Sequence, residues 1–199
     1  SYAVPYDIIV EKVWLRYAER LLSNMSRGLL GHIDVSPYKY DLEKARDLLK
    51  QAGYPNGFNT EIYHGGMNYD VEREKDILTW IQAEFKKIGV NAEIKTLPLP
   101  AFQEFAMGGT GTKEDWDAHK GKAPMSVFAY LPYVPDPNYD LDVMIKSYGF
   151  ANKYSCYYSN PEVDSLLVQA FGEMDEKKRV TLFEKIQRIS VVEDAPQIL

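Results

Sequence analysis

Apolar residues recur every three or four positions in several stretches of the chain, and this spacing predicts amphipathic helices. The clearest helix begins after Asp41, a good N-cap, and ends at Gly53, beyond which Pro55 bars its continuation. Two later helices are expected after the Asn160-Pro161 pair and after Asp175. The predicted main helices cover residues 41–52, 70–88, 161–171 and 175–192.

Runs rich in β-forming residues lie between these helices and predict strands near residues 58–64, 90–97 and 126–130. A strand–helix–strand rhythm implies parallel pairing through a right-handed crossover. We therefore expect an α/β fold in which the three strands share one sheet, flanked by helices. Weaker patterns predict a helix over Pro5–Leu22, short helices near 101–107 and 141–147, exposed or aromatic loops over 108–124 and 148–159, and a strand beginning at 195–199.

The stretch SVFAYLPYVPDPNY, residues 126–139, begins as a strand and then becomes rich in proline and tyrosine. Proline has no N–H for a sheet ladder and fixes φ, so the strand must end in a stiff loop. Ligands of open α/β sheets bind beyond the strand ends. The candidate ligand-binding residues are those of this loop and of the end of a neighbouring strand: Tyr130, Tyr133, Asp136, Tyr139, Tyr63 and His64.

These residues alone leave a second interpretation open, namely a proline-rich surface turn whose tyrosines pack onto the core. Asp136 is expected to cap the following helix or to fix the loop, more than to touch a ligand. The aromatic faces of the tyrosines are expected to stack on the ligand.

Composition narrows the function classes. A net charge of −6 without a cluster of Lys and Arg argues against a nucleic-acid partner. The single cysteine, Cys156, excludes an internal disulfide, and no apolar run approaches the roughly 18 residues that span a bilayer. The stretch GGTGTK lacks the spacing of a phosphate loop, and the three histidines show no metal-ligand spacing. We expect no cofactor, no metal and no catalysis.

Three segments resemble one family. They read YKYDLEKARDLLKQAGYPNGF (38–58), IQAEFKKIGVNAEIKTLPLPAF (81–102) and YSNPEVDSLLVQAFGEMDEKKRVTLFEKIQRISVVEDAP (158–196). They resemble the C-terminal lobe of the extracytoplasmic solute-binding proteins of family 5, which serve peptide, nickel and oligosaccharide ABC importers. The first and third segments are specific, whereas the second alone is weak.

The resemblance implies a two-lobe, periplasmic-binding-protein-like fold with a mixed sheet, in which a solute is held between the lobes. Residues 1–199 would form a single C-terminal lobe, and the N-terminal lobe would lie outside this chain. The implied protein is periplasmic or extracellular, with anchoring as a lipoprotein as a further expectation. Its implied partners are a small-molecule solute, the permease subunits of the importer and the missing lobe.

The resemblance also shows where the candidate site of this chain differs from the family pattern. Asp136-Pro137 matches an Asp-Pro pair of the family, Tyr130 stands at its tryptophan position, and Tyr133 stands where peptide binders place an aspartate. A phenol is a poor partner for a buried ammonium group, so Tyr133 argues against capture of a peptide N-terminus. A ligand that stacks on the rings, such as an oligosaccharide, is the other possibility. The predicted function is the capture of an oligopeptide or oligosaccharide for import. The alternative is a sensing or interaction module of the same fold that signals to a membrane partner.

Overall fold

The computed structural model describes residues 1–65, 71–102, 114, 125–127, 134–147 and 158–194. The chain forms two compact units. Unit 1 comprises Ser1–Arg20, Tyr38–Gln103 and Pro124–Ala129, and unit 2 comprises Leu21–Pro37, Glu104–Ala123 and Tyr130–Leu199. The prediction that residues 1–199 form a single lobe stays a prediction.

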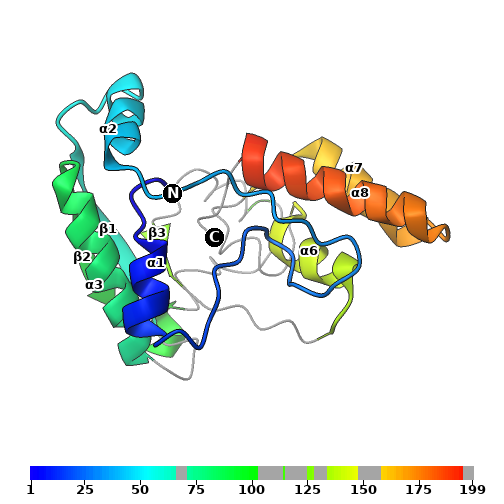
Figure 1. Cartoon of the computed structure of the whole chain (residues 1–199), viewed down its shortest axis with the longest axis horizontal. Helices are drawn as coiled ribbons and strands as arrows, with labels where there is room; N and C mark the ends of the chain where they lie inside the picture. Colours follow the sequence, from blue (N-terminus) through cyan, green and yellow to red (C-terminus); the bar gives the residue numbers. More distant parts are fainter. Residues whose placement is uncertain (66–70, 103–113, 115–124, 128–133, 148–157, 195–199) are drawn as a thin grey trace. The chain divides into compact units, whose positions relative to one another are not determined.

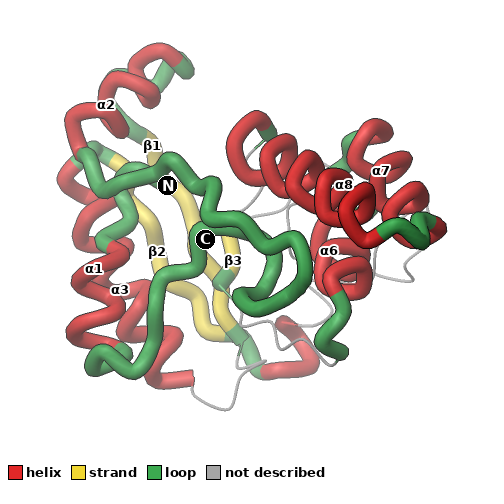
Figure 2. The backbone as a smooth tube through the Cα atoms, turned by 45° about the vertical axis from the view of Figure 1, so that its right-hand side comes forward, coloured by secondary structure: helices red, strands yellow, loops and turns green. Residues whose placement is uncertain are grey.

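Unit 1 is built on a three-stranded sheet with the strand order β2-β1-β3 (Figure 2). Strand β1 (Phe58–His64) pairs in parallel with β2 (Val90–Thr96) and with the short β3 (Met125–Ser126). Each strand starts within two residues of its predicted position. The expectation that the three strands share a sheet is confirmed, and so is the α/β fold class.

Helices α2 (Leu42–Gln51) and α3 (Val71–Lys87) follow the predicted pattern (Figure 1). The side chain of Asp41 accepts a hydrogen bond from the backbone N–H of Lys44 at 2.9 Å, which caps α2 as expected. Helix α3 packs on β1 and β2. Its apolar stripe joins the sheet in one buried core, which includes Ile62, Leu78, Ile81, Phe85, Val90 and Ala92.

The predicted first helix is too long. Helix α1 covers only Tyr6–Ile8, continues as a π-helix over Ile9–Val13, and does not reach Leu22. The backbone N–H of Arg16 bonds the carbonyl of Val10 at 2.9 Å, and this bond closes the helix end. Both Leu15 and Arg16 have positive φ, at 50° and 65°, so the helix stops without a glycine to signal it.

Unit 2 contains three α-helices among its described residues: α6 (Pro137–Ile145), α7 (Pro161–Gly172) and α8 (Glu176–Arg188). A π-helix, Ile189–Glu193, continues α8 to about the predicted end. Helices α7 and α8 lie side by side (Figure 1). Asn160 and Asp175 cap them as predicted. Helix α6 begins four residues before the predicted start, because Pro137 fits the first helical position.

A buried glutamine fixes the segment Leu21–Pro37 to α8. The side-chain oxygen of Gln187 accepts bonds from the Ser23 hydroxyl at 2.7 Å and the Ile33 N–H at 3.1 Å, and its Nε2 donates to the Gly31 carbonyl at 2.7 Å. Gly31 lies so close to α8 that a Cβ would meet Phe183 at 3.0 Å.

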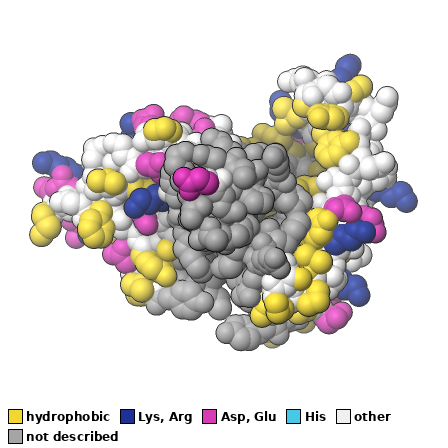
Figure 3. Space-filling view, turned by 180° about the vertical axis from the view of Figure 1, so that it is seen from behind, with side chains coloured by type: hydrophobic (Ala, Val, Ile, Leu, Met, Phe, Trp, Pro, Cys, Tyr) yellow, Lys and Arg dark blue, Asp and Glu magenta, His cyan; other side chains and the backbone are white. Residues whose placement is uncertain are grey.

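Hydrophobic side chains also reach the surface of unit 2, which lies at the left of Figure 3. Val168, Phe171 and Met174 are among the exposed hydrophobic residues of this unit.

Several predictions fall outside the described residues. They concern most of the short helix 101–107 and the loop 108–124, the tyrosine-rich end of the strand at 128–133, most of the aromatic loop 148–159, and the strand expected at 195–199.

Candidate functional site

The end of β1 carries two of the predicted site residues, Tyr63 and His64. Successive side chains of a strand point to opposite faces of its sheet. His64 therefore shares the face of the buried Ile62, which α3 covers, whereas Tyr63 lies on the other face. The register pairs Tyr63 with Lys95 and His64 with Thr96 of β2.

Tyr63 belongs to a polar network on the face of the sheet opposite the core. Its hydroxyl donates a hydrogen bond to the carboxylate of Glu61, and this bond raises the pKa of the Tyr63 phenol. Lys95 Nζ lies 3.8 Å from Glu61 and 2.5 Å from Glu93. Its hydrogen bond to Glu93 raises the pKa of the Lys95 ammonium group. This face thus offers a phenol ring, carboxylates and one shared cation to a polar ligand.

His64 is 0% exposed, and its side chain is engaged inside unit 1. Its Nε2 lies 2.7 Å from the hydroxyl of Thr96, and its Nδ1 lies 3.6 Å from Oε2 of Glu74 on α3. Glu74 is also buried. These contacts join the ends of β1 and β2 to α3. The prediction that His64 contacts a solute stays a prediction, and in this structure its imidazole presents no surface to solvent.

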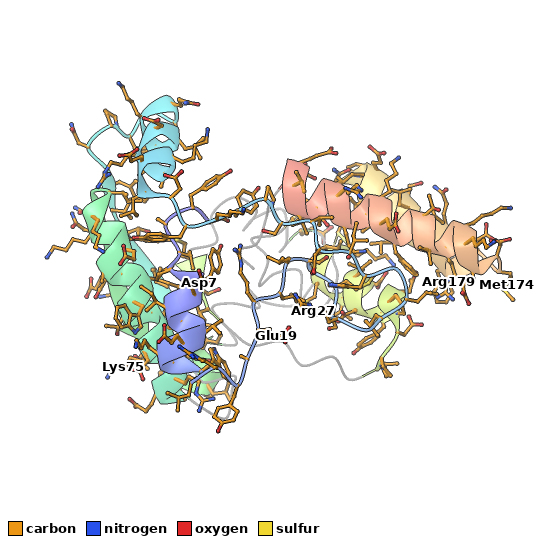
Figure 4. All side chains as sticks on the ribbon, in the orientation of Figure 1. Asp7, Glu19, Arg27, Lys75, Met174 and Arg179 are labelled. Atoms are coloured by element: carbon orange, nitrogen blue, oxygen red, sulfur yellow. The ribbon has the colours of Figure 1, made fainter. Side chains whose placement is uncertain are left out.

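Asp136 and Tyr139 lie at the beginning of α6 in unit 2. One Asp136 oxygen accepts a hydrogen bond from the N–H of Tyr139 at 2.9 Å, so Asp136 caps the helix as expected. Its other oxygen lies 3.9 Å from Nη2 of Arg179, which Figure 4 labels on α8. Tyr139 is half-buried. This arrangement makes Asp136 a structural residue of the loop end, whether or not it also meets a ligand.

The remaining two candidates, Tyr130 and Tyr133, lie outside the described residues. Tyr63 and His64 therefore lie at one strand end on opposite faces of the sheet, and Asp136 and Tyr139 lie at one helix start. The first pair belongs to unit 1 and the second to unit 2. Ligand contact by any of the six residues stays a prediction.

Sequence reasoning missed a buried carboxylate next to this helix start. Asp140 is 1% exposed, and its Oδ2 accepts a hydrogen bond from the N–H of Ser26 at 2.7 Å. The bond ties the segment Leu21–Pro37 to α6. No periodic pattern marks Asp140, because it stands beside Leu141 at a position where the sequence predicts an exposed polar side chain. Only the tertiary contact shows its role.

A second group of polar contacts in unit 2 is centred on Asp194. The Tyr158 hydroxyl and Asn160 Nδ2 both donate to Oδ2 of Asp194, at 2.5 Å and 2.7 Å. Burial and the bond to Asp194 raise the pKa of the Tyr158 phenol strongly. Because Asn160 also caps α7, this contact joins the start of α7 to the end of the π-helix that follows α8.

Neither a metal site nor a membrane span emerges from the part of the chain that the structure describes. Within it, no three His, Cys, Asp or Glu side chains are grouped so as to hold a metal ion. No helix there is long and apolar enough to cross a bilayer.

Comparison with known proteins places the chain in a family. The model of the bacterial extracellular solute-binding proteins, family 5 (Middle), matches residues 1–152. Over its full length the chain is 27% identical to the glutathione-binding protein GsiB of Pectobacterium atrosepticum and 28% identical to heme-binding protein A of Haemophilus influenzae. It spans only 37% and 34% of these relatives. Both are named as binding proteins, in agreement with the prediction that this chain is not an enzyme.

A solved structure supports the same assignment. The periplasmic binding protein DppA of Helicobacter pylori, in complex with the peptide STSA, superposes with a TM-score of 0.81 at 27% identity. The match covers 98% of this chain and 35% of that protein. The family resemblance of the sequence is thus confirmed. With a family model matched over residues 1–152, the chain belongs to family 5 of the bacterial extracellular solute-binding proteins.

Proposed function

We propose that the chain is the C-terminal lobe of the substrate-binding component of an ABC importer. The full-length protein captures an oligopeptide or oligosaccharide outside the cytoplasm, in a cleft between two lobes, and delivers it to the permease. The observation that carries this proposal is the family match over residues 1–152, together with the likeness of nearly the whole chain to a peptide-bound periplasmic binding protein.

The solute is the finer part of the proposal. One relative is named for glutathione and another for heme, so family membership by itself does not choose the ligand. The choice rests on the tyrosines of this chain. We assign stacking contacts to Tyr130, Tyr133 and Tyr139, because an aromatic ring gives a large contact area against a flat ligand face. Tyr63 adds a phenol that is already oriented by Glu61.

Two supporting roles complete the proposed site. Asp136 fixes the start of α6 and thereby the position of Tyr139. His64 supports the end of β1 from the core side through Thr96 and Glu74, while Tyr63 faces the other side. No acid–base chemistry is required of either residue. Binding and release of the solute are the whole activity of the proposed protein.

The experiment uses the full-length protein, purified from its source without refolding, and identifies the carried solute by mass spectrometry. Calorimetry with that solute then compares the wild type with Tyr130→Ala. The expected loss is about 1–3 kcal/mol, or roughly 5- to 150-fold in affinity, the range for a large buried aromatic side chain. Tyr54→Ala, an exposed tyrosine before β1, is the matched control and should leave affinity unchanged.

Unchanged affinity of a stably folded Tyr130→Ala protein would contradict the assigned site. A full-length protein that carries and binds no solute would instead favour the interaction module.

A further inference from the structure

A tight turn joins α2 to β1 (Figure 1), and it contains Asn56, the one asparagine of the sequence that a glycine follows. The N–H of Gly57 donates a hydrogen bond to the carbonyl of Tyr54 at 3.0 Å, which closes the turn over four residues. Pro55 stands at the second position of the turn, where its fixed φ is favoured.

The turn packs backbone against backbone on the start of β2. Gly57 and Gly89 both have positive φ, at 73° and 83°. A Cβ on Gly57 would overlap the carbonyl group of Gly89, and a Cβ on Gly89 would lie 2.8 Å from the carbonyl oxygen of Asn56. The next residues of the two segments, Phe58 and Val90, form the first pair of the ladder between β1 and β2. The turn thus determines where this ladder begins.

An asparagine followed by glycine is chemically labile when its backbone can move, because glycine has no side chain to hinder the approach. The deprotonated backbone nitrogen of Gly57 attacks Cγ of Asn56, a C–N bond forms, and the side-chain amide leaves as ammonia. The product is a cyclic succinimide. Water then opens the ring at either carbonyl, which leaves aspartate or isoaspartate at position 56. The reaction consumes only water and requires no enzyme.

The folded turn opposes this reaction in two ways. The N–H of Gly57 is held by the Tyr54 carbonyl, so its proton is not readily lost. The rotation that would bring the nitrogen to Cγ of Asn56 would also drive Gly57 into the Gly89 carbonyl. The reaction must therefore wait until the turn opens, and its rate follows the population of the open form.

We propose that Asn56 is a spontaneous deamidation site that the folded turn protects, and that its isoaspartate product keeps the turn from closing again. Isoaspartate inserts one more atom into the main chain before Gly57, and the packing against Gly89 leaves no room even for a Cβ there. A reversible opening thereby becomes permanent, and β1 loses the beginning of its ladder with β2. Neither step depends on the proposed importer or its solute.

The first test compares the full-length protein with a capped synthetic peptide of the sequence Tyr54–Phe58, at the same mildly alkaline pH and temperature. Mass spectrometry with fragmentation follows deamidation at Asn56 over time. Asn59, which Thr60 follows, is the internal control and should stay unmodified. Deamidation of Asn56 should be at least about tenfold slower in the protein than in the peptide, and urea below the unfolding midpoint should narrow this difference.

A pair of glycine variants tests whether the packing against Gly89 gives the protection. Gly89→Ala introduces a Cβ against the Asn56 carbonyl at a positive φ, and it should accelerate deamidation at least about fivefold. Gly28→Ala is the matched control, because Gly28 has a similar φ of 84° but no atom within 4 Å of the added Cβ, and it belongs to unit 2. Deamidation at Asn56 should keep its wild-type rate in Gly28→Ala.

Equal rates in the protein and the peptide, or equal acceleration by the two glycine variants, would overturn protection by the turn. If Gly89→Ala does not fold, the urea series of the wild type decides, and a rate that does not rise with urea contradicts the proposal.

The isoaspartate form, separated by chromatography, tests the second step. Asn56→Asp is its matched control, because it carries the same charge without the additional main-chain atom. Hydrogen exchange of the β1 amides should be at least about tenfold faster in the isoaspartate form than in the wild type, and unchanged in Asn56→Asp. Equal exchange in the isoaspartate form and the wild type would show that the turn closes in spite of the modification. Equally fast exchange in both modified forms would assign the effect to charge, and either result would overturn this step.

Discussion

Tyr63 and His64 are neighbours in sequence, but the strand gives them different environments. Tyr63 bonds Glu61 on the face away from the core, and His64 is enclosed between Thr96 and Glu74. One solute cannot touch both side chains from the same face of the sheet. Tyr63 is therefore the stronger candidate for direct contact, and His64 the stronger candidate for holding the strand end in place.

Tyr40 shows how one buried carboxylate changes the titration of a partly exposed phenol. Its hydroxyl donates to Oε2 of Glu84 at 2.5 Å, and Glu84 is buried and also binds Lys87 at 2.7 Å. Burial and then the bond to Glu84 raise the pKa of Tyr40 from 10.0 to about 12. The neutral phenol is thus favoured in the folded state.

This shift predicts a pH dependence of stability. A raised folded-state pKa contributes stability that is fully present below pH 10 and is lost as the pH rises through about 12. In Tyr40→Phe, the free energy of unfolding by urea should fall less between these pH values than in the wild type. Parallel curves for the two proteins would contradict the described bond between Tyr40 and Glu84.

At the scale of elements, short-range signals predicted the helix starts well. Asp41, Asn160 and Asp175 all cap helices through bonds to backbone N–H groups two or three residues ahead, so the sequence alone reveals them. The end of the first helix could not be predicted, because no glycine or proline marks the left-handed turn at Leu15. Asp140 and Gln187 act through partners more than a hundred residues away, which no local pattern indicates.

The cap of α6 gives a prediction at this scale. Asp136→Ala removes the acceptor of the Tyr139 N–H and should lower the free energy of unfolding by about 0.5–2 kcal/mol. Asp136→Asn is the matched control, because asparagine caps equally well but cannot pair with Arg179. In urea unfolding of this chain, the free energy of unfolding of the Asn variant should be close to that of the wild type. Equal losses in both variants would mean that the contact with Arg179, and not the cap, stabilises α6.

At the scale of the whole molecule, three segments, of which the first and third are specific, sufficed to predict the family. Capped helices that alternate with strands predicted its α/β fold. The site was less predictable. Its tyrosines stand on a proline-rich loop whose side-chain directions no period determines, and Tyr130 and Tyr133 lie outside the described residues. The chain also spans only 37% of the relative GsiB, so a cleft between lobes would need residues beyond it.

The central claim is that this chain supplies one side of a solute-binding cleft. Isothermal titration calorimetry with the solute carried by the full-length protein tests it, applied to this chain and to that protein under the same conditions. If the full-length protein binds at about 1 μM, roughly −8 kcal/mol, losing half of that free energy leaves the isolated chain in the millimolar range. We therefore predict a folded chain with an affinity weaker by about a thousandfold. Equal micromolar affinity of both proteins would contradict the account, because the chain would then carry the site alone.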